Sequence, residues 1–138
     1  MTDGEVGRLA SKEKYVEMAK RYLENGLRFL KKNEAEKASE MLWGSAAQAV
    51  KAVAAKGGRE LRAHHLLSKF VRELSKERQE PELFVQFDAI QWLHSNFYES
   101  ELTVEDVIAR LEIVKKFVRR MLGFAKTAGH QVSKRNEA

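Results

Sequence analysis

His64 and His65 are the side chains of this sequence best suited to proton transfer, and Arg59 precedes them by five and six positions. Imidazole titrates near neutral pH and a guanidinium neutralises phosphate, so these residue types are those that RNA cleavage requires. Helical stepping separates Arg59 from His64 by about 140° if both lie in one helix. They share a face only if Arg59 precedes that helix. We therefore treat the three as candidate catalytic residues, alongside a purely structural interpretation.

A second group surrounds His94, which lies in the middle of an apolar helix face. A histidine in such a place is commonly a buried, hydrogen-bonded core residue. The functional alternative is a small polar pocket in which His94, Asn96 and Tyr98 are joined by His64 or His65. Neither a carboxylate pair nor His-x-x-x-His spacing accompanies these residues, so we expect no metal ion and no cofactor.

The densest basic run of the chain comprises Lys115, Lys116, Arg119 and Arg120. The formal net charge of +5 permits an anionic partner without identifying one. These cations form either a solvated helix face or a surface that contacts the phosphate backbone of a nucleic acid. Stacking aromatic residues do not interleave with them, which argues against sequence-specific recognition of single strands.

Helices must position all of these residues, because apolar residues recur with helical spacing and β-branched residues never alternate over a useful length. We predict an all-α fold, an up-and-down antiparallel bundle of about five helices over residues 11–125. A flexible leader (1–10) precedes the bundle, and a polar basic tail (126–138) follows it. The expected boundaries are marked by an N-cap at Ser11, a capping box of Asn33 and Glu36, the Gly57-Gly58 pair, Pro81, and a cap of Thr103 with Asp106. The expected helices are 11–32, 34–56, 59–75, 81–99 and 104–125, with a loop at 76–81.

The segment 39–55 is expected to be the central helix, because its apolar residues form two faces instead of one. One face carries small and aliphatic residues, and the roughly opposite face carries Trp43, Ala47 and Val50. The last helix likewise adds Ile113, Phe117 and Phe124 to its main stripe. A single bundle needs one inward stripe per helix, so we predict a homodimer whose interface uses these extra faces.

Cysteine is absent, which removes disulfides and thiolate metal sites and fits an intracellular protein. No apolar run approaches the ~20 residues that a membrane span needs. The first residues lack the apolar segment of a signal peptide. We therefore expect a cytoplasmic protein that does not bind membranes.

Three separated segments, ASEMLWGSAAQAVKAVAA, LRAHHLLSKFV and LHSNFYESELTVEDV, resemble the archaeal PaREP family. That family is in turn similar to HEPN domains, small helical proteins named for nucleotide binding. The resemblance covers roughly residues 11–125 and implies a helical bundle that is commonly dimeric. Many HEPN proteins are metal-independent ribonucleases that use an arginine followed four to six residues later by a histidine. Arg59 with His64 or His65 matches that pattern, although here the string lies on the third helix.

The leading functional hypothesis is an HEPN-like module that binds a nucleotide or RNA without robust catalysis. Its setting would be a small regulatory or toxin–antitoxin-type system, in which the resemblance implies a nucleotidyltransferase-type antitoxin as partner. One alternative is a metal-independent ribonuclease toxin. Another is a helical interaction subunit with no ligand.

Overall fold

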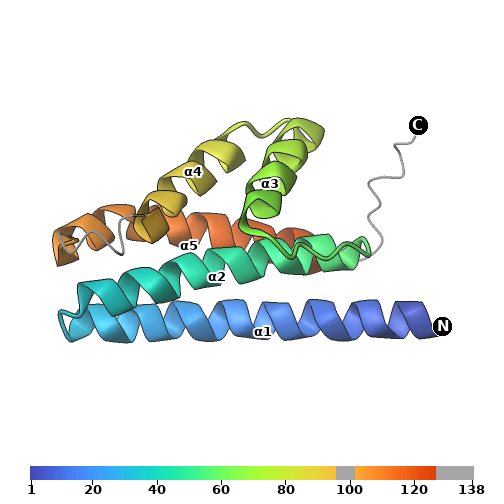
Figure 1. Ribbon diagram of the computed structural model, residues 1–138, viewed down its shortest axis with the longest axis horizontal. Coiled ribbons are helices and arrows are strands. Elements are labelled where there is room, and N and C mark those ends of the chain that lie inside the picture. Colours follow the sequence, from blue (N-terminus) through green and yellow to red (C-terminus); the bar gives the residue numbers. More distant parts are fainter. Residues whose placement is uncertain (96–101, 127–138) are drawn as a thin grey trace.

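Two long helices, α1 (Asp3–Lys31) and α2 (Ala35–Lys56), form an antiparallel hairpin along one side of the molecule (Figure 1). This computed structural model describes residues 1–95 and 102–126. The described part of the chain is all-helical and has five helices. The predicted all-α bundle is thereby confirmed.

The first helix begins earlier than the sequence pattern predicted. Thr2 and Glu5 form a capping box, in which the Glu5 N–H donates to the Thr2 hydroxyl at 3.1 Å and the Thr2 N–H donates to the Glu5 carboxylate at 2.8 Å. The expected cap at Ser11 is therefore wrong. Residues 3–10 continue α1 and do not form a separate loose leader.

The turn between α1 and α2 uses Asn33 differently from the prediction. Asn33 adopts a left-handed conformation (φ 60°), which asparagine tolerates better than most residues. The N-cap of α2 is Glu34, which makes no side-chain capping bond. The expected capping box of Asn33 and Glu36 is wrong because Asn33 closes the turn and does not cap the helix.

Small residues bring α1 and α2 close together. A Cβ atom on Gly26 would lie 2.7 Å from Leu42 Cδ2, and one on Gly44 would lie 2.9 Å from the Tyr22 ring. Beyond the Gly44 contact, the Ser45 hydroxyl donates to the Ala19 carbonyl at 2.7 Å. The hydroxyl is buried with its hydrogen bond satisfied, and the small residues let the two backbones approach closely.

A second hairpin, α3 (His64–Arg78) and α4 (Glu82–Ser95), lies obliquely on the side of α2 away from α1 (Figure 1). As predicted, Gly57 and Gly58 end α2, and Gly58 has a φ of +83° that favours glycine. The segment 57–63 then runs without helix, so α3 starts after the expected residue Arg59. It also extends further, which reduces the expected 76–81 loop to residues 79–81.

The last helix, α5 (Val104–Lys126), contacts α1, α2 and α4. Its start was predicted correctly. The Thr103 N–H donates to the Asp106 carboxylate at 3.0 Å, and the Asp106 N–H donates to the Thr103 hydroxyl at 3.1 Å. The backbone hydrogen bond from Thr103 is the largest cause that lowers the pKa of Asp106.

The helix α2 is central, as expected, because it contacts all four other helices. Its two apolar faces are both covered within one chain: Val50 is 0% exposed and Trp43 is 8% exposed. On α5, Phe117 packs against Phe87 with ring centroids 5.5 Å apart. The residues expected at a dimer interface are thus interior or nearly so, namely Trp43, Ala47, Val50, Phe117 and Phe124 (buried) and Ile113 (partly buried).

Candidate functional site

Three aromatic rings from three helices form a stack at the start of α3. The centroids of Trp43 and His64 lie 4.9 Å apart, those of Trp43 and His94 lie 5.0 Å apart, and those of the two imidazoles lie 5.1 Å apart. All three pairs are within 25° of parallel. The fold therefore brings together two candidate histidines that are 30 positions apart in sequence.

The exposed member of this stack is His64, whereas His94 is partly buried. The Nε2 atom of His64 lies 3.4 Å from the Gln91 side-chain amide nitrogen. Burial first, and then the nearby His94 and His65, lower the pKa of His64 below its ordinary value. A neutral imidazole is thus favoured at neutral pH, where it accepts a proton or a hydrogen bond.

Arg59 makes its contacts elsewhere. Its guanidinium carbon lies 4.9 Å from the Phe70 ring centroid, and its Nη1 atom lies 3.3 Å from a carboxylate oxygen of Glu73. Because Arg59 precedes α3, the 140° separation expected within one helix does not apply. Its charge is nevertheless engaged by Glu73, while His64 stacks on Trp43. His65 is exposed beside them.

The pocket expected around His94 is described only in part. His94 lies against Trp43 and His64, but Asn96 and Tyr98 lie outside the described residues. The predicted pocket of His94, Asn96 and Tyr98 therefore remains a prediction. The stacking role of Trp43 was not foreseen, because its helical position indicated an interface residue.

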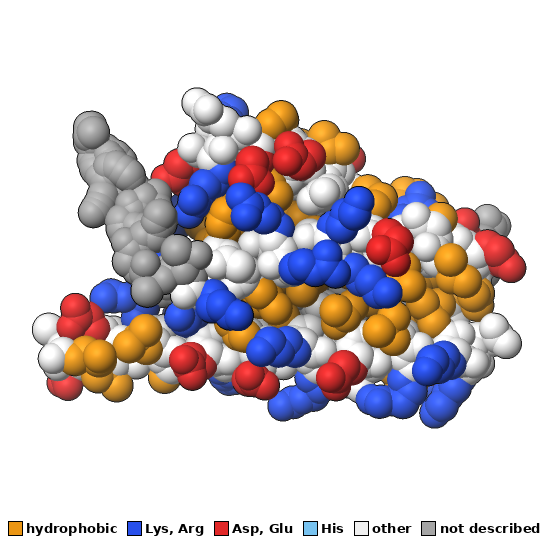
Figure 2. All heavy atoms as spheres, turned by 180° about the vertical axis from the view of Figure 1, so that it is seen from behind, with side chains coloured by type: hydrophobic (Ala, Val, Ile, Leu, Met, Phe, Trp, Pro, Cys, Tyr) orange, Lys and Arg blue, Asp and Glu red, His pale blue; other side chains and the backbone are white. Residues whose placement is uncertain are grey.

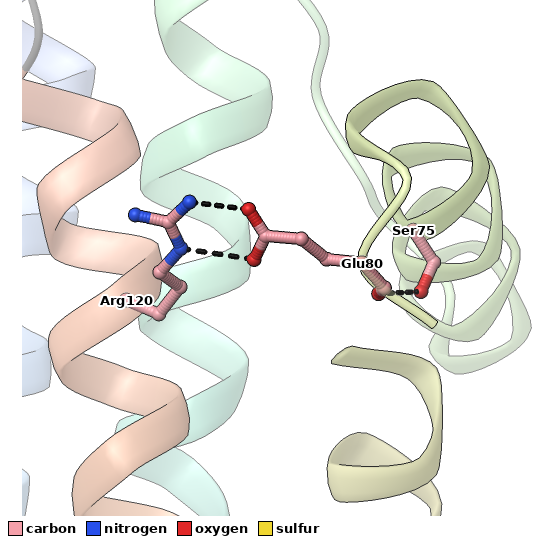
Figure 3. Close-up of polar contacts among 3 residues, drawn as sticks. All are labelled: Ser75, Glu80 and Arg120. Carbon is pink, nitrogen blue, oxygen red and sulfur yellow. Dashed lines mark hydrogen bonds and ion pairs between the residues drawn. The ribbon is translucent and has the colours of Figure 1, made fainter. Parts of the chain in front are cut away.

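Two of the four basic residues predicted on α5 are paired with carboxylates. Lys115 Nζ lies 3.6 Å from Glu112. Arg120 donates from Nε at 3.0 Å, and also from Nη2, to the two carboxylate oxygens of Glu80 (Figure 3). The hydrogen bond from Arg120 lowers the pKa of Glu80. Ser75 fixes the loop that carries Glu80, because its hydroxyl donates to the Glu80 carbonyl at 2.8 Å.

Arg119 belongs to a groove between α1 and α5 with a volume of about 520 Å³. Among the described residues, no ion pair involves Arg119 or Lys116. Figure 2 shows Lys and Arg side chains gathered along this face over both helices, with hydrophobic side chains between them. The charged lining comprises Lys12, Lys20, Arg119 and Lys126, with Glu13 and Glu17.

Sequence reasoning missed the α1 half of this groove. Lys12 and Lys20 are eight positions apart, so they lie on one side of α1. Nothing in the sequence indicated that this side would adjoin Arg119. A pairing of two helices that are distant along the chain carries no local signal.

The sequence matches the archaeal PaREP1/PaREP8 family over residues 14–118. The chain belongs to this family. The match spans the three residues of the aromatic stack and their amide neighbour Gln91, and it ends one residue before Arg119. No curated protein matches the sequence.

A crystal structure of a protein from Sulfolobus solfataricus has the same fold as this PaREP1/PaREP8 chain, with a TM-score of 0.70 and 21% sequence identity. The similarity covers 79% of this chain and 97% of the other. In the described ranges, 1–95 and 102–126, no helix is long and apolar enough to cross a membrane. Within the same ranges, no group of three or more His, Cys, Asp or Glu side chains could hold a metal ion.

Proposed function

We propose that the protein binds phosphate groups of RNA or of a nucleotide in the groove between α1 and α5, and that it catalyses no robust reaction on them. The observation that carries the proposal is the convergence of four cations from two helices on one groove. Lys12 and Lys20 come from α1, and Arg119 and Lys126 come from α5.

The charge balance of the groove supports an anionic ligand. Cations outnumber carboxylates two to one along its lining, and Glu17 is already within 3.9 Å of Lys20. Val16 and Leu122 supply apolar surface between the charges. A groove of about 520 Å³ is within the size range of small-ligand sites, so it accommodates a nucleotide unit of a longer strand.

The HEPN resemblance extends this proposal to a biological setting. It supports a homodimer that acts in a small regulatory or toxin–antitoxin-type system, with a nucleotidyltransferase-type antitoxin as partner. The competing ribonuclease hypothesis would require Arg59 to act with His64 or His65. The contacts of Arg59 with Glu73 and Phe70 favour a structural role for that arginine.

The proposal is tested by titrating a labelled single-stranded oligoribonucleotide with the protein in EDTA at several salt concentrations. Phosphate contacts release counterions, so we expect affinity to fall steeply with salt, by a logarithmic slope of roughly 0.7 per contact. Arg119→Glu and Lys20→Glu should each weaken binding and flatten this slope. The RNA should be recovered intact.

The matched control is Lys69→Glu, which makes the same change of charge at an exposed position of α3. Its affinity should stay near that of the unmodified protein. An affinity that is independent of salt, or an equal loss in Lys69→Glu and Lys20→Glu, would contradict the groove proposal. Cleavage that disappears in Arg59→Ala and His64→Ala would instead support the ribonuclease hypothesis.

A further inference from the structure

Three cations from three helices converge on one residue near the end of α5. The guanidinium carbons of Arg78 and Arg120 lie 4.5 Å and 4.3 Å from the centroid of the Phe124 ring. The Lys56 ammonium donates to the Phe124 carbonyl oxygen at 2.7 Å. Because Lys56 ends α2 and Arg78 ends α3, the ends of three helices meet at this point.

Only one of these cations has a carboxylate partner in the described part of the chain. Glu80 binds Arg120 through both carboxylate oxygens, whereas no ion pair of the described residues involves Lys56 or Arg78. The Nε atom of Arg78 is buried without a hydrogen-bond partner. Positive charge therefore accumulates around Phe124 beyond what Glu80 balances.

The excess of positive charge affects the pKa of Lys56. Burial first, and then the positive charges of Arg78 and Lys12, lower the pKa of its ammonium group. The hydrogen bond to the Phe124 carbonyl explains why Lys56 is stable as a cation here, because the C-terminal end of a helix attracts positive charge. It does not account for the positive charges of Arg78 and Lys12 near Lys56.

We infer that Lys12, Lys56 and Arg78 form a seat for a phosphoryl group at one end of the α1–α5 groove. Lys12 lines that groove together with Ala125 and Lys126, the two residues that follow Phe124, so it connects the seat with the cations proposed to contact RNA. Three cations beside one seat suit a doubly charged phosphate monoester better than a singly charged diester. The ligand class is therefore a nucleotide, or an RNA strand, with a terminal phosphate.

This inference rests on the proposed function for the rest of the ligand, but the seat itself is tested with inorganic phosphate alone. The pKa of Lys56 is measured by NMR on protein with ¹³C-labelled lysine, with and without phosphate at constant ionic strength. Bound phosphate stabilises the ammonium form, so we expect the pKa of Lys56 to rise. The signal of Lys69, at an exposed position of α3, is the control and should not respond to phosphate. A pKa of Lys56 that phosphate leaves unchanged would overturn the seat.

The terminal phosphate is tested with two oligoribonucleotides that differ only in a 5′-phosphate or 5′-hydroxyl end, and with their 3′-phosphorylated counterparts. We expect one terminal phosphate to improve binding about tenfold, which corresponds to one strong charge-assisted contact. Lys12→Gln and Lys56→Gln should abolish this advantage. Lys12→Gln keeps the Phe124 carbonyl bonded to Lys56, so its effect is not a consequence of lost folding.

The outcomes separate the two proposals. RNA that binds with the expected salt dependence, but without preference for either phosphorylated end, would overturn the seat and leave the groove in place. A phosphate-dependent rise in the pKa of Lys56 without RNA binding would support the seat and overturn the proposed function. An end preference that survives in both Lys12→Gln and Lys56→Gln would place the terminal phosphate elsewhere and overturn the seat.

Discussion

The stack of Trp43, His64 and His94 couples the protonation of one imidazole to the folded state. The pKa of His64 is lower in the folded protein than its ordinary value of 6.5. Between these two values the unfolded chain binds more protons, so stability rises with pH across this window. We expect this contribution to be complete above about pH 6.5 and to fall as the pH approaches the folded pKa.

Thermal unfolding between pH 5 and 8 measures this effect. The imidazoles of His94 and His65 lie near His64, so single variants are needed to separate their contributions. His64→Gln should reduce the dependence of the melting temperature on pH, whereas His65→Gln, at an exposed neighbouring position, should change it little. Equal pH profiles for His64→Gln and the unmodified protein would contradict the coupling.

At the residue scale, the sequence identified His64, His65 and His94 as notable but did not predict their arrangement. His64 and His94 are held together by Trp43, whose position on α2 indicated only an apolar face. The prediction that Arg59 acts with His64 depended on local spacing. Spacing along the chain does not show that Glu73, 14 positions away, engages the arginine.

At the scale of helices, close packing of α1 on α2 depends on Gly26. We expect Gly26→Ala to destabilise the protein despite the better helix propensity of alanine, because the new Cβ atom would lie 2.7 Å from Leu42 Cδ2 and 3.0 Å from Leu42 Cγ. Gly7→Ala is the matched control on the same helix, since nothing lies within 4 Å of its Cβ position. That change should stabilise by up to about 1 kcal/mol.

Chemical denaturation of both variants measures the difference in unfolding free energy. A Gly26→Ala protein that gains as much stability as Gly7→Ala would show that α1 and α2 separate easily at this contact. The result would also test whether the tight hairpin, and not intrinsic propensity, determines how α1 packs.

Helix number and order were predictable because apolar periodicity persists over whole helices, while several helix ends were not. The sequence predicted a cap formed by Thr103 and Asp106, and the structure contains it. Asn33 has the same cap chemistry but takes a left-handed turn conformation instead, and Thr2 caps α1 ahead of Ser11. Residues that suit caps also suit turns, so tertiary packing decides between the two roles.

At the scale of the whole molecule, the extra apolar faces of α2 and α5 are used within one chain. The layer of α3 and α4 covers α2 on the side away from α1, and Phe117 packs against Phe87 inside the bundle. Phe117→Ala should therefore cost about 3–5 kcal/mol of unfolding free energy. Phe117→Glu should unfold the chain, because it would place an unpaired carboxylate in the core.

Circular dichroism during chemical denaturation distinguishes this expectation from an interface role for Phe117. A Phe117→Glu protein that stays folded and only loses mass in light scattering would contradict the interior position. Ile113→Glu is the comparison on α5, and it should destabilise the protein less because Ile113 is only partly buried.

The homodimer remains a prediction, and we now expect its interface at a different surface. The first turns of α1 extend beyond the end of α2 (Figure 1), and they expose Val6 and Leu9 at 52% and 44%. These two residues are three positions apart, so they share one side of the helix. A twofold axis beside this segment would cover the same apolar residues of both copies.

Light scattering at micromolar concentration should therefore give twice the 15.8 kDa mass of one chain. Leu9→Glu should shift the protein toward monomer without unfolding it, because this part of α1 has few neighbours to lose and glutamate is a good helix former. Val85→Glu is the control, since Val85 is 66% exposed but lies on α4. A single-chain mass for the unmodified protein would refute the dimer, and a Leu9→Glu protein that remains dimeric would exclude the first turns of α1 as its interface.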